Sequence, residues 1–261
     1  MGNIFQPSTQ EKNILLLGLE RAGKTHMLYN YLVGEGGMHT IKKLKETLGM
    51  NYEHIVESPQ NFDVWDISGN PLLRKQWTLY ISNIPVAGII YVVNISEDIE
   101  RIREGKKQLH KLMSEPALSD SILAVVFNVK PNISINNGNS AGQMANNQEE
   151  EKKRGEDQQN YNNGNNQQSS TPLKPLARKK DQWVESPFNQ EQLEKIFELS
   201  KLKRTMIKQS FYIDIGEQKA CEKVFQWMSG KLDYKLRVKA KRERKLVQEQ
   251  QQPPQNEEDD K

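Results

Sequence analysis

The chain has 261 residues, of which 35% are hydrophobic, and its mean hydropathy is −0.81. A chain of this length can fill one well-packed core, but so polar a composition indicates that much of it stays outside any core. The formal net charge of +3 is too small to argue for nucleic-acid binding, and the single cysteine, Cys221, excludes an internal disulfide. No apolar run has the length of a membrane span, so we expect a cytoplasmic protein.

The first half of the chain alternates predicted strands and helices. An apolar run from Asn13 to Leu17 is followed by a glycine, and apolar residues from Met27 to Leu32 then recur at helical spacing. Buried strands are predicted at Phe62–Ile67, Gly88–Asn94 and Ile122–Asn128, and an amphipathic helix at Glu97–Met113. This alternation predicts an α/β fold with a mostly parallel sheet and helices on both faces.

The composition changes abruptly after Lys130. Ile135 to Thr171 is dominated by Asn, Gln, Ser, Gly and charged residues, which bury too little apolar surface to offset the entropy of ordering. We therefore expect a low-complexity, disordered insertion at 134–187. Order is expected to resume near Pro187, where Asn189 caps a predicted helix with apolar positions from Leu193 to Met206.

The predicted fold ends with a strand at Phe211–Ile215 and a helix at Ala220–Leu232. A charged segment continues as a solvated helix until Pro253 stops it. The predicted organisation is an N-terminal arm at 1–12, one α/β domain at 13–133 and 188–232, the insertion at 134–187, and a charged tail at 233–261.

The strongest motif runs from Gly18 to Thr25. Its sequence, GLERAGKT, fits G-x-x-x-x-G-K-S/T directly after a predicted strand and at the start of a predicted helix. Glycines let the backbone N–H groups surround a phosphate, and the start of the helix adds partial positive charge. The predicted phosphate-binding residues are Gly18, Glu20, Arg21, Ala22, Gly23, Lys24, Thr25 and His26. The alternative, a glycine-rich turn with a fortuitous Lys-Thr pair, is disfavoured by the elements on either side.

Three of the predicted roles are chemically specific. Lys24 is expected to reach the β and γ phosphates, and the Thr25 hydroxyl to bind Mg²⁺. Asp66 ends the apolar strand Phe62–Asp66, where a carboxylate holds the metal through water. On its own, an Asp at that position is more often an ordinary strand-end acid.

Several segments together resemble the ADP-ribosylation factor (Arf) and Arf-like small GTPases. They are Met1–Phe5 (MGNIF), Gly18–Thr25, Thr47–Asn51 (TLGMN), Val64–Gly69 (VWDISG), Gly88–Val93 (GIIYVV), Phe211–Ile213 (FYI) and Phe225–Met228 (FQWM). The resemblance covers residues 1–133 and 189–232. It implies the small G-domain fold of phosphate-loop nucleotide hydrolases, with GTP or GDP and Mg²⁺ as cofactors.

The resemblance also implies two residues that sense the third phosphate. Thr47 matches the switch I threonine that closes on Mg²⁺, and Gly69 matches the switch II glycine whose N–H contacts the γ-phosphate. Groups that bond only when this phosphate is present convert nucleotide state into loop order. Without its neighbouring motifs, Thr47 is an ordinary surface threonine.

The chain departs from the family pattern where catalysis and guanine recognition are expected. Asn70 stands where the family carries the glutamine that orients the attacking water, so we expect slow hydrolysis. Ser68 replaces a glycine and restricts the backbone. The segment Asn128-Val-Lys-Pro131 aligns with the guanine motif N-K-x-D, and Asn128 and Lys130 are expected to contact the nucleotide, but Pro131 replaces the carboxylate that reads guanine. Asp214, in a shortened loop, is a candidate substitute.

The two ends of the chain suggest weak membrane contact. Gly2 is placed for N-myristoylation, although Gln6 departs from the usual Ser or Thr. A single acyl chain binds membranes only marginally, so a second signal is needed. The basic segment from Lys231 to Lys245 offers one, or binds an acidic partner, or is simply a solvated helix.

Three functions fit these observations. The first is a monomeric GTP-binding switch with slow hydrolysis, which recruits protein effectors, is served by an exchange factor and, by family analogy, acts in membrane traffic or in ciliary or cytoskeletal regulation. The second is a pseudo-GTPase scaffold with weak or base-unselective nucleotide binding. An ATPase or kinase ranks last, because no substrate-domain or catalytic-base motif is visible.

Overall fold

The computed structural model describes residues 12–34, 47–129, 187–203 and 206–251. These described residues all belong to one compact unit. Gly2, Lys130, Pro131 and nearly all of the predicted insertion lie outside the described residues. Within the described residues, no helix is both long and apolar enough to cross a membrane.

One six-stranded sheet organises the described chain, in the order β2-β3-β1-β4-β5-β6. Only the β2–β3 pair is antiparallel, and the other neighbouring strands are parallel. The strands are β1 (Asn13–Leu17), β2 (Met50–Ile55), β3 (Phe62–Ile67), β4 (Val86–Asn94), β5 (Ile122–Asn128) and β6 (Lys208–Ile213). The predicted, mostly parallel α/β fold is therefore confirmed.

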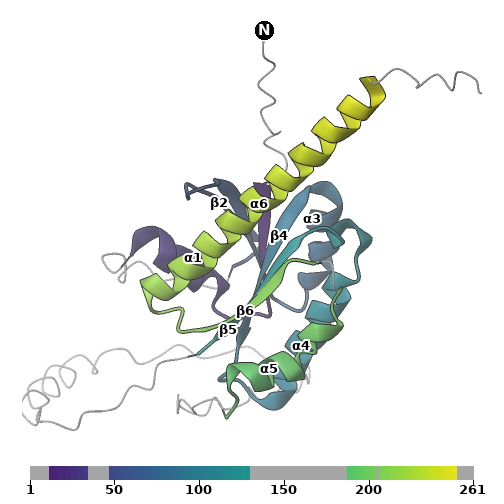
Figure 1. The fold of residues 1–261 in the computed structure, drawn as a ribbon. Coiled ribbons are helices and arrows are strands. Elements are labelled where there is room, and N and C mark those ends of the chain that lie inside the picture. The colour runs from purple at the N-terminus through teal and green to yellow at the C-terminus, as the bar shows by residue number, and fades with distance from the viewer. Residues whose placement is uncertain (1–11, 35–46, 130–186, 204–205, 252–261) are drawn as a thin grey trace, which may run out of the picture. The chain divides into compact units, whose positions relative to one another are not determined.

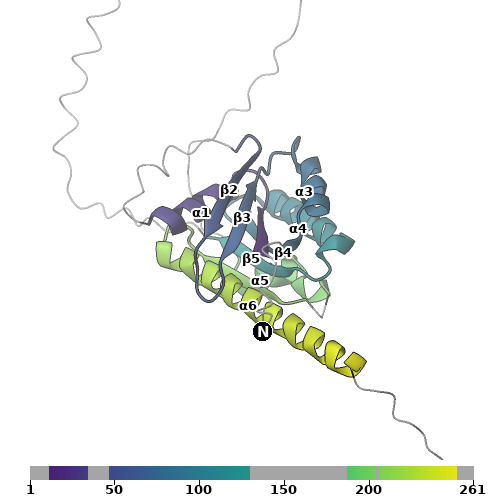
Figure 2. The same ribbon diagram turned by 90° about the horizontal axis from the view of Figure 1, so that it is seen from above.

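Helices cover both faces of this sheet (Figures 1 and 2). One layer holds α1 (Lys24–Val33) and α6 (Gln218–Gln251), and the other holds α3 (Trp77–Asn83), α4 (Ile99–Met113) and α5 (Gln190–Ile196). Short 3₁₀ turns occur at η3 (Arg74–Gln76), η4 (Pro116–Leu118) and η6 (Leu199–Lys201).

The core is divided by the sheet into two apolar layers, because successive strand residues point to opposite faces. In β1, Leu15 packs in the layer under α3, α4 and α5, whereas Ile14 packs in the layer under α1 and α6. The strands β4 and β5 are buried on both faces, which explains their continuous apolar sequences.

The N-terminal caps of α5 and α4 are made by side chains close to them in the sequence. Asn189 and Gln192 form the reciprocal capping box of α5, and the Asp98 carboxylate accepts a hydrogen bond from the Arg101 N–H at the start of α4. The helix after Asn189 is shorter than predicted, however. Glu198 adopts a left-handed conformation (φ 48°) just beyond α5, so Met206 lies outside the helix although it is buried.

Three other elements differ from the prediction. The last strand is β6, at 208–213 instead of 211–215. The strand β2 and the helix α3 carried no clear pattern: β2 is a half-exposed edge strand, and α3 has only seven residues.

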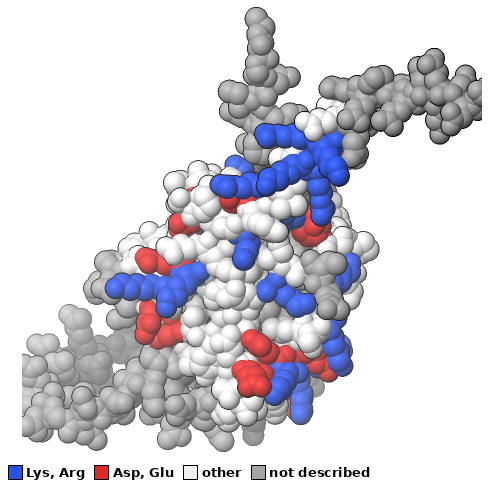
Figure 3. Space-filling view, in the orientation of Figure 1, with Lys and Arg blue, Asp and Glu red and all other residues white. Residues whose placement is uncertain are grey.

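The predicted last helix and charged segment form one continuous helix, α6, whose outer end carries a cluster of basic side chains (Figure 3).

Candidate phosphate and metal site

The loop between β1 and α1 requires glycine at two positions. Gly18 has φ +143°, and a Cβ there would lie 2.2 Å from the Val92 carbonyl oxygen. Gly23 has φ +100°, and a Cβ there would lie 2.3 Å from the Ile215 side chain. The backbone angle therefore favours glycine at both positions, and at Gly18 the fixed backbone of Val92 also leaves no space for a side chain. The loop is thus shaped as the glycines of the motif predict, directly before α1.

Lys24 folds back over this loop. Its Nζ donates to the carbonyls of Gly18 (3.2 Å) and Leu19 (3.0 Å), and the residue is only 6% exposed. Burial lowers the pKa of Lys24 to about 8, and the nearby Asp66 carboxylate opposes that shift only in part. A desolvated ammonium group beside a loop that leads into the N-terminus of a helix is a strong site for a bound anion.

Asp66 is the penultimate residue of β3, lies beside Thr25 and is completely buried. Its Oδ2 accepts hydrogen bonds from Thr25 Oγ1 (2.5 Å) and Asn51 Nδ2 (3.1 Å), while its Oδ1 has no hydrogen-bond partner. Burial raises the pKa of Asp66, against the opposing effects of the Thr25 hydroxyl and the Lys24 charge. A buried, unpartnered carboxylate oxygen is costly unless a cation or donor meets it.

Thr47 joins these two residues from the segment before β2. Its hydroxyl lies 3.0 Å from the Thr25 hydroxyl, which itself bonds to Asp66. Three oxygen-bearing side chains from separate parts of the chain thus meet at one point, and this donor set suits a hard cation such as Mg²⁺. The described ranges contain no group of three or more His, Cys, Asp or Glu side chains able to hold a metal.

Gly69 lies directly against the phosphate loop. Its carbonyl accepts a hydrogen bond from the Glu20 N–H (3.0 Å), and a Cβ on Gly69 would lie 2.3 to 2.4 Å from backbone atoms of Gly18, Leu19 and Glu20. Those atoms belong to the backbone and not to a flexible side chain. The loop after β3 is therefore in tight contact with the predicted phosphate site.

Asn70 turns its side chain along its own loop. The Asn70 Oδ1 accepts a hydrogen bond from the Leu72 N–H (2.9 Å), and its backbone N–H donates to the Ser68 hydroxyl (3.3 Å). This is the local turn chemistry typical of asparagine. The predicted role of Asn70 in hydrolysis stays a prediction, and in this conformation its amide caps a turn.

Asn128 ends β5 on the side where the base is expected. The residue is buried, its Nδ2 donates to the Ala22 carbonyl (3.2 Å), and its Oδ1 has no hydrogen-bond partner. The candidate acid Asp214 instead accepts a hydrogen bond from the Gly216 N–H through Oδ1 (2.7 Å). Lys130, which is predicted to contact the nucleotide, and Pro131, which replaces the guanine-reading acid, lie outside the described residues.

The remaining predicted residues line the same loop. Arg21 has φ 61° and is exposed, Ala22 is buried, and His26 is half-buried in the first turn of α1. Sequence reasoning missed Asn30 and Asn51. Asn30 donates to the Ile215 carbonyl (2.9 Å), and so ties the loop after β6 to α1. Asn51 closes the segment Thr47–Asn51, but the resemblance implied no role for it, and Asn30 belongs to no motif.

Comparison with known proteins agrees with this arrangement. The model of the ADP-ribosylation factor family matches residues 1–158. Among solved structures, the Arl6 BBS3 small GTPase from Trypanosoma brucei, with bound nucleotide analogue GppNp, is similar at a TM-score of 0.56 and 15% sequence identity. The similarity covers 86% of this chain and 98% of that chain, and at this identity it shows the fold. Because the family match spans more than half of the chain, the protein belongs to the ADP-ribosylation factor family.

Proposed function

We propose that the protein is a guanine-nucleotide-dependent switch that binds GTP or GDP together with Mg²⁺. The observation that carries the proposal is the meeting of Thr25, Thr47 and Asp66 beside the phosphate loop. Thr47 comes from a separate segment of the chain, so its closeness to Thr25 couples loop order to the contents of the site. The GppNp bound to the similar Arl6 protein supports a guanine nucleotide as the ligand.

The residues of the site divide the work of holding a polyphosphate. Lys24 offers its ammonium group, and the backbone of the loop and the start of α1 offer N–H groups. Thr25 and Thr47 would hold Mg²⁺ through their hydroxyls, and Asp66 would hold it through water. Bound Mg²⁺ would neutralise charge on the phosphate oxygens. The loop segments that carry Thr47 and Gly69 would then be ordered by the third phosphate.

Effector binding is the expected output of such a switch, and the surface supports it. Leu48, next to Thr47, is 93% exposed, and Leu72, two residues after Asn70, is 84% exposed. Large apolar side chains on nucleotide-sensing loops are suited to a partner that reads loop order. We propose a cytoplasmic monomer by family analogy, served by an exchange factor, with a role in membrane traffic or in ciliary or cytoskeletal regulation.

We propose that hydrolysis is slow. Asn70 is shorter than the family glutamine, and its Oδ1 already accepts the Leu72 N–H. To orient a water molecule the amide would have to break that turn and extend further than its length allows. The protein would therefore stay in the triphosphate state unless a partner supplied the missing group.

A second candidate is a scaffold with weak or base-unselective nucleotide binding. It is favoured by the base side of the site, where Asp214 is engaged by the Gly216 N–H and Pro131 occupies the place of the guanine-reading acid. Loss of a charge-assisted pair of hydrogen bonds costs about 3 kcal/mol, roughly a hundredfold in affinity. The phosphate and metal contacts do not depend on that acid.

Titration of the full chain with labelled GTP, GDP and ATP, with and without Mg²⁺, tests both candidates. The switch predicts Mg²⁺-dependent binding with preference for guanine, and equal affinity for GTP and ATP would favour relaxed selectivity. Lys24→Ala should abolish binding, whereas Lys107→Ala, an exposed lysine on α4, should not. Binding unchanged by Lys24→Ala would refute the assignment of the site, and no binding by the native protein would leave the scaffold.

Membrane contact is a separate proposal. The part of α6 beyond Leu232 carries Arg237, Lys241, Arg242 and Arg244, all of them exposed. Basic side chains gather at this outer end of the helix (Figure 3). Basic residues of this kind add to the weak anchoring of one acyl chain on Gly2. Mass spectrometry of the native protein should find an N-terminal myristoyl mass, and its absence would remove this proposal.

A further inference from the structure

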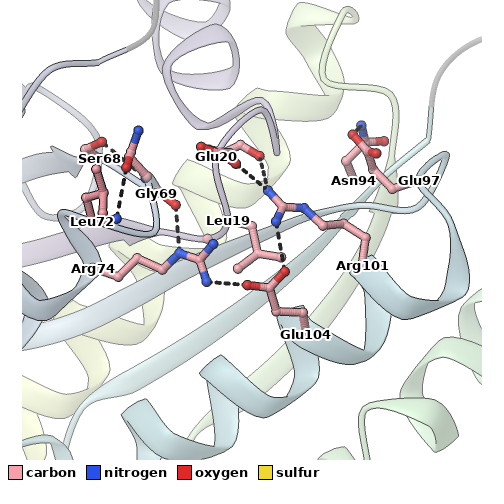
Figure 4. A network of polar contacts seen from close by, with 12 residues as sticks. Leu19, Glu20, Ser68, Gly69, Leu72, Arg74, Asn94, Glu97, Arg101 and Glu104 are labelled. Atoms are coloured by element: carbon pink, nitrogen blue, oxygen red, sulfur yellow. Dashed lines mark hydrogen bonds and ion pairs between the residues drawn. The ribbon is translucent and has the colours of Figure 1, made fainter. Parts of the chain in front are cut away.

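Five residues next to the phosphate site form a closed ring of polar contacts (Figure 4). The Glu20 N–H donates to the Gly69 carbonyl (3.0 Å), and Arg74 Nε donates to the same carbonyl (2.8 Å). Arg74 Nη1 pairs with one oxygen of Glu104 (2.5 Å), and Arg101 Nη1 with the other (2.8 Å). Arg101 Nη2 then returns to the Glu20 carboxylate (3.2 Å) and carbonyl (3.3 Å). We call this set the arginine ring.

The arginine ring joins three parts of the fold that are distant in sequence. Glu20 belongs to the phosphate loop, Gly69 and Arg74 to the segment after β3, and Arg101 and Glu104 to α4. Arg101 and Glu104 are three residues apart on α4, which places them on the same helix face, and Arg74 reaches the same Glu104 carboxylate from the segment after β3. The helix α4 is fixed by its apolar contacts to β4 and β5, and it therefore serves as the rigid support of the ring.

Arg74 is the most constrained member. Its side chain is only 9% exposed, against 36% for Glu104, and its planar guanidinium donates to Gly69 and Glu104 in two directions at once. Burial alone would raise the pKa of Glu104, but hydrogen bonds and charge from Arg74 and then Arg101 outweigh it and hold that pKa below its usual range. Charge-assisted bonds in a partly desolvated site are stronger than surface ion pairs.

The ring acts on the position of Gly69. Both donors to the Gly69 carbonyl belong to the ring, and the Gly69 backbone already touches the phosphate loop so closely that a Cβ cannot fit. If Arg74 is released, the carbonyl keeps only the Glu20 N–H, and the segment after β3 loses this polar link to α4. The placement of the Gly69 N–H therefore depends on Arg74, Glu104 and Arg101.

We propose that Arg74, Glu104 and Arg101 are positioning residues that hold Gly69 at the end of the phosphate site, and so set how strongly the protein prefers a triphosphate over a diphosphate. The inference rests on the proposed nucleotide-binding function. The proposed function assigns the Gly69 N–H to the third phosphate alone, so displacement of Gly69 would weaken binding of the triphosphate and leave the diphosphate contacts of Lys24 and Thr25 in place.

The experiment measures dissociation constants of full-length protein for a non-hydrolysable GTP analogue and for GDP, both with Mg²⁺. In Glu104→Gln the ratio of the two affinities should shift about tenfold against the triphosphate, within the usual range of coupling between sites. The matched control is Glu100→Gln on the same helix, because Glu100 forms an exposed pair with Arg103 (2.6 Å) outside the ring. Arg74→Lys should resemble Glu104→Gln, since lysine keeps the charge but has no planar fork.

The outcomes separate this inference from the function on which it rests. If native protein binds both nucleotides and Glu104→Gln weakens both equally, or neither, the positioning role is wrong while the switch stands. If the native protein binds no nucleotide, the proposed function fails first. If circular dichroism shows that Glu104→Gln is unfolded, two other variants replace it. Arg101→Gln, in the ring, must shift the affinity ratio, and Arg103→Gln, outside the ring, must not.

Discussion

Replacement of the buried Lys24 by methionine tests the electrostatics of the phosphate loop in a way that does not need nucleotide. The pKa of Lys24 falls from its ordinary value of 10.5 to about 8, chiefly because the group is buried. Between about pH 8 and pH 10.5 the unfolded chain therefore binds more protons than the folded chain, and at pH 7 the buried, charged lysine costs about 3 kcal/mol of stability. Methionine fills similar space without charge.

The sign of the pH dependence follows from the direction of this shift. Because the folded pKa is lowered, the penalty is complete well below pH 8 and is relieved as pH rises from about 8 to 10.5. The native protein should therefore gain about 1 kcal/mol relative to Lys24→Met between pH 7 and pH 9. The variant itself should be more stable at pH 7, by less than the full penalty, because the Gly18 and Leu19 carbonyls lose their donor.

Urea unfolding of nucleotide-free protein at pH 7 and pH 9 measures these differences. Lys107→Met serves as the control because Lys107 is exposed on α4. Saturation with GTP and Mg²⁺ should reverse the order of stability at pH 7, since only the native protein binds phosphate. A difference between native protein and Lys24→Met that is the same at both pH values would refute the reasoning, because it would mean that Lys24 keeps its ordinary hydration.

Three further predictions follow from other contacts. Asn70→Gln should speed single-turnover GTP hydrolysis, and an unchanged rate would contradict the idea that side-chain reach limits it. Asp66→Asn should weaken nucleotide binding in Mg²⁺ but not in EDTA, and equal weakening in both would argue against a metal role. Ser229→Ala removes reciprocal hydrogen bonds to the Gln60 backbone (2.9 and 3.0 Å) and should cost about 1–3 kcal/mol in urea unfolding; no loss would mean that water replaces them.

The parts of the site that the sequence could predict are contiguous or periodic. The phosphate loop lies within eight residues, and its glycines, lysine and threonine act through the local backbone between a strand and a helix. The buried strands β4 and β5 and the capped start of α5 also carry local signals in hydrophobic pattern and cap chemistry. The edge strand β2 carried no such local signal, because an exposed antiparallel edge alternates only weakly between buried and exposed residues.

Contacts between distant segments were decided only by tertiary structure. The motif position of Asn70 predicted a role in hydrolysis, but in the folded chain its Oδ1 accepts a hydrogen bond from the Leu72 N–H. Arg74 and Glu104 carry no motif, and they meet only because the sheet brings the end of β3 beside α4. By itself, then, the sequence determined the phosphate loop and most of the strands and helices, since these depend on local backbone chemistry and periodicity, and its motifs indicated the family. The arginine ring and the meeting of Thr47 with Thr25 depend on how whole elements pack, and only the folded chain specifies that.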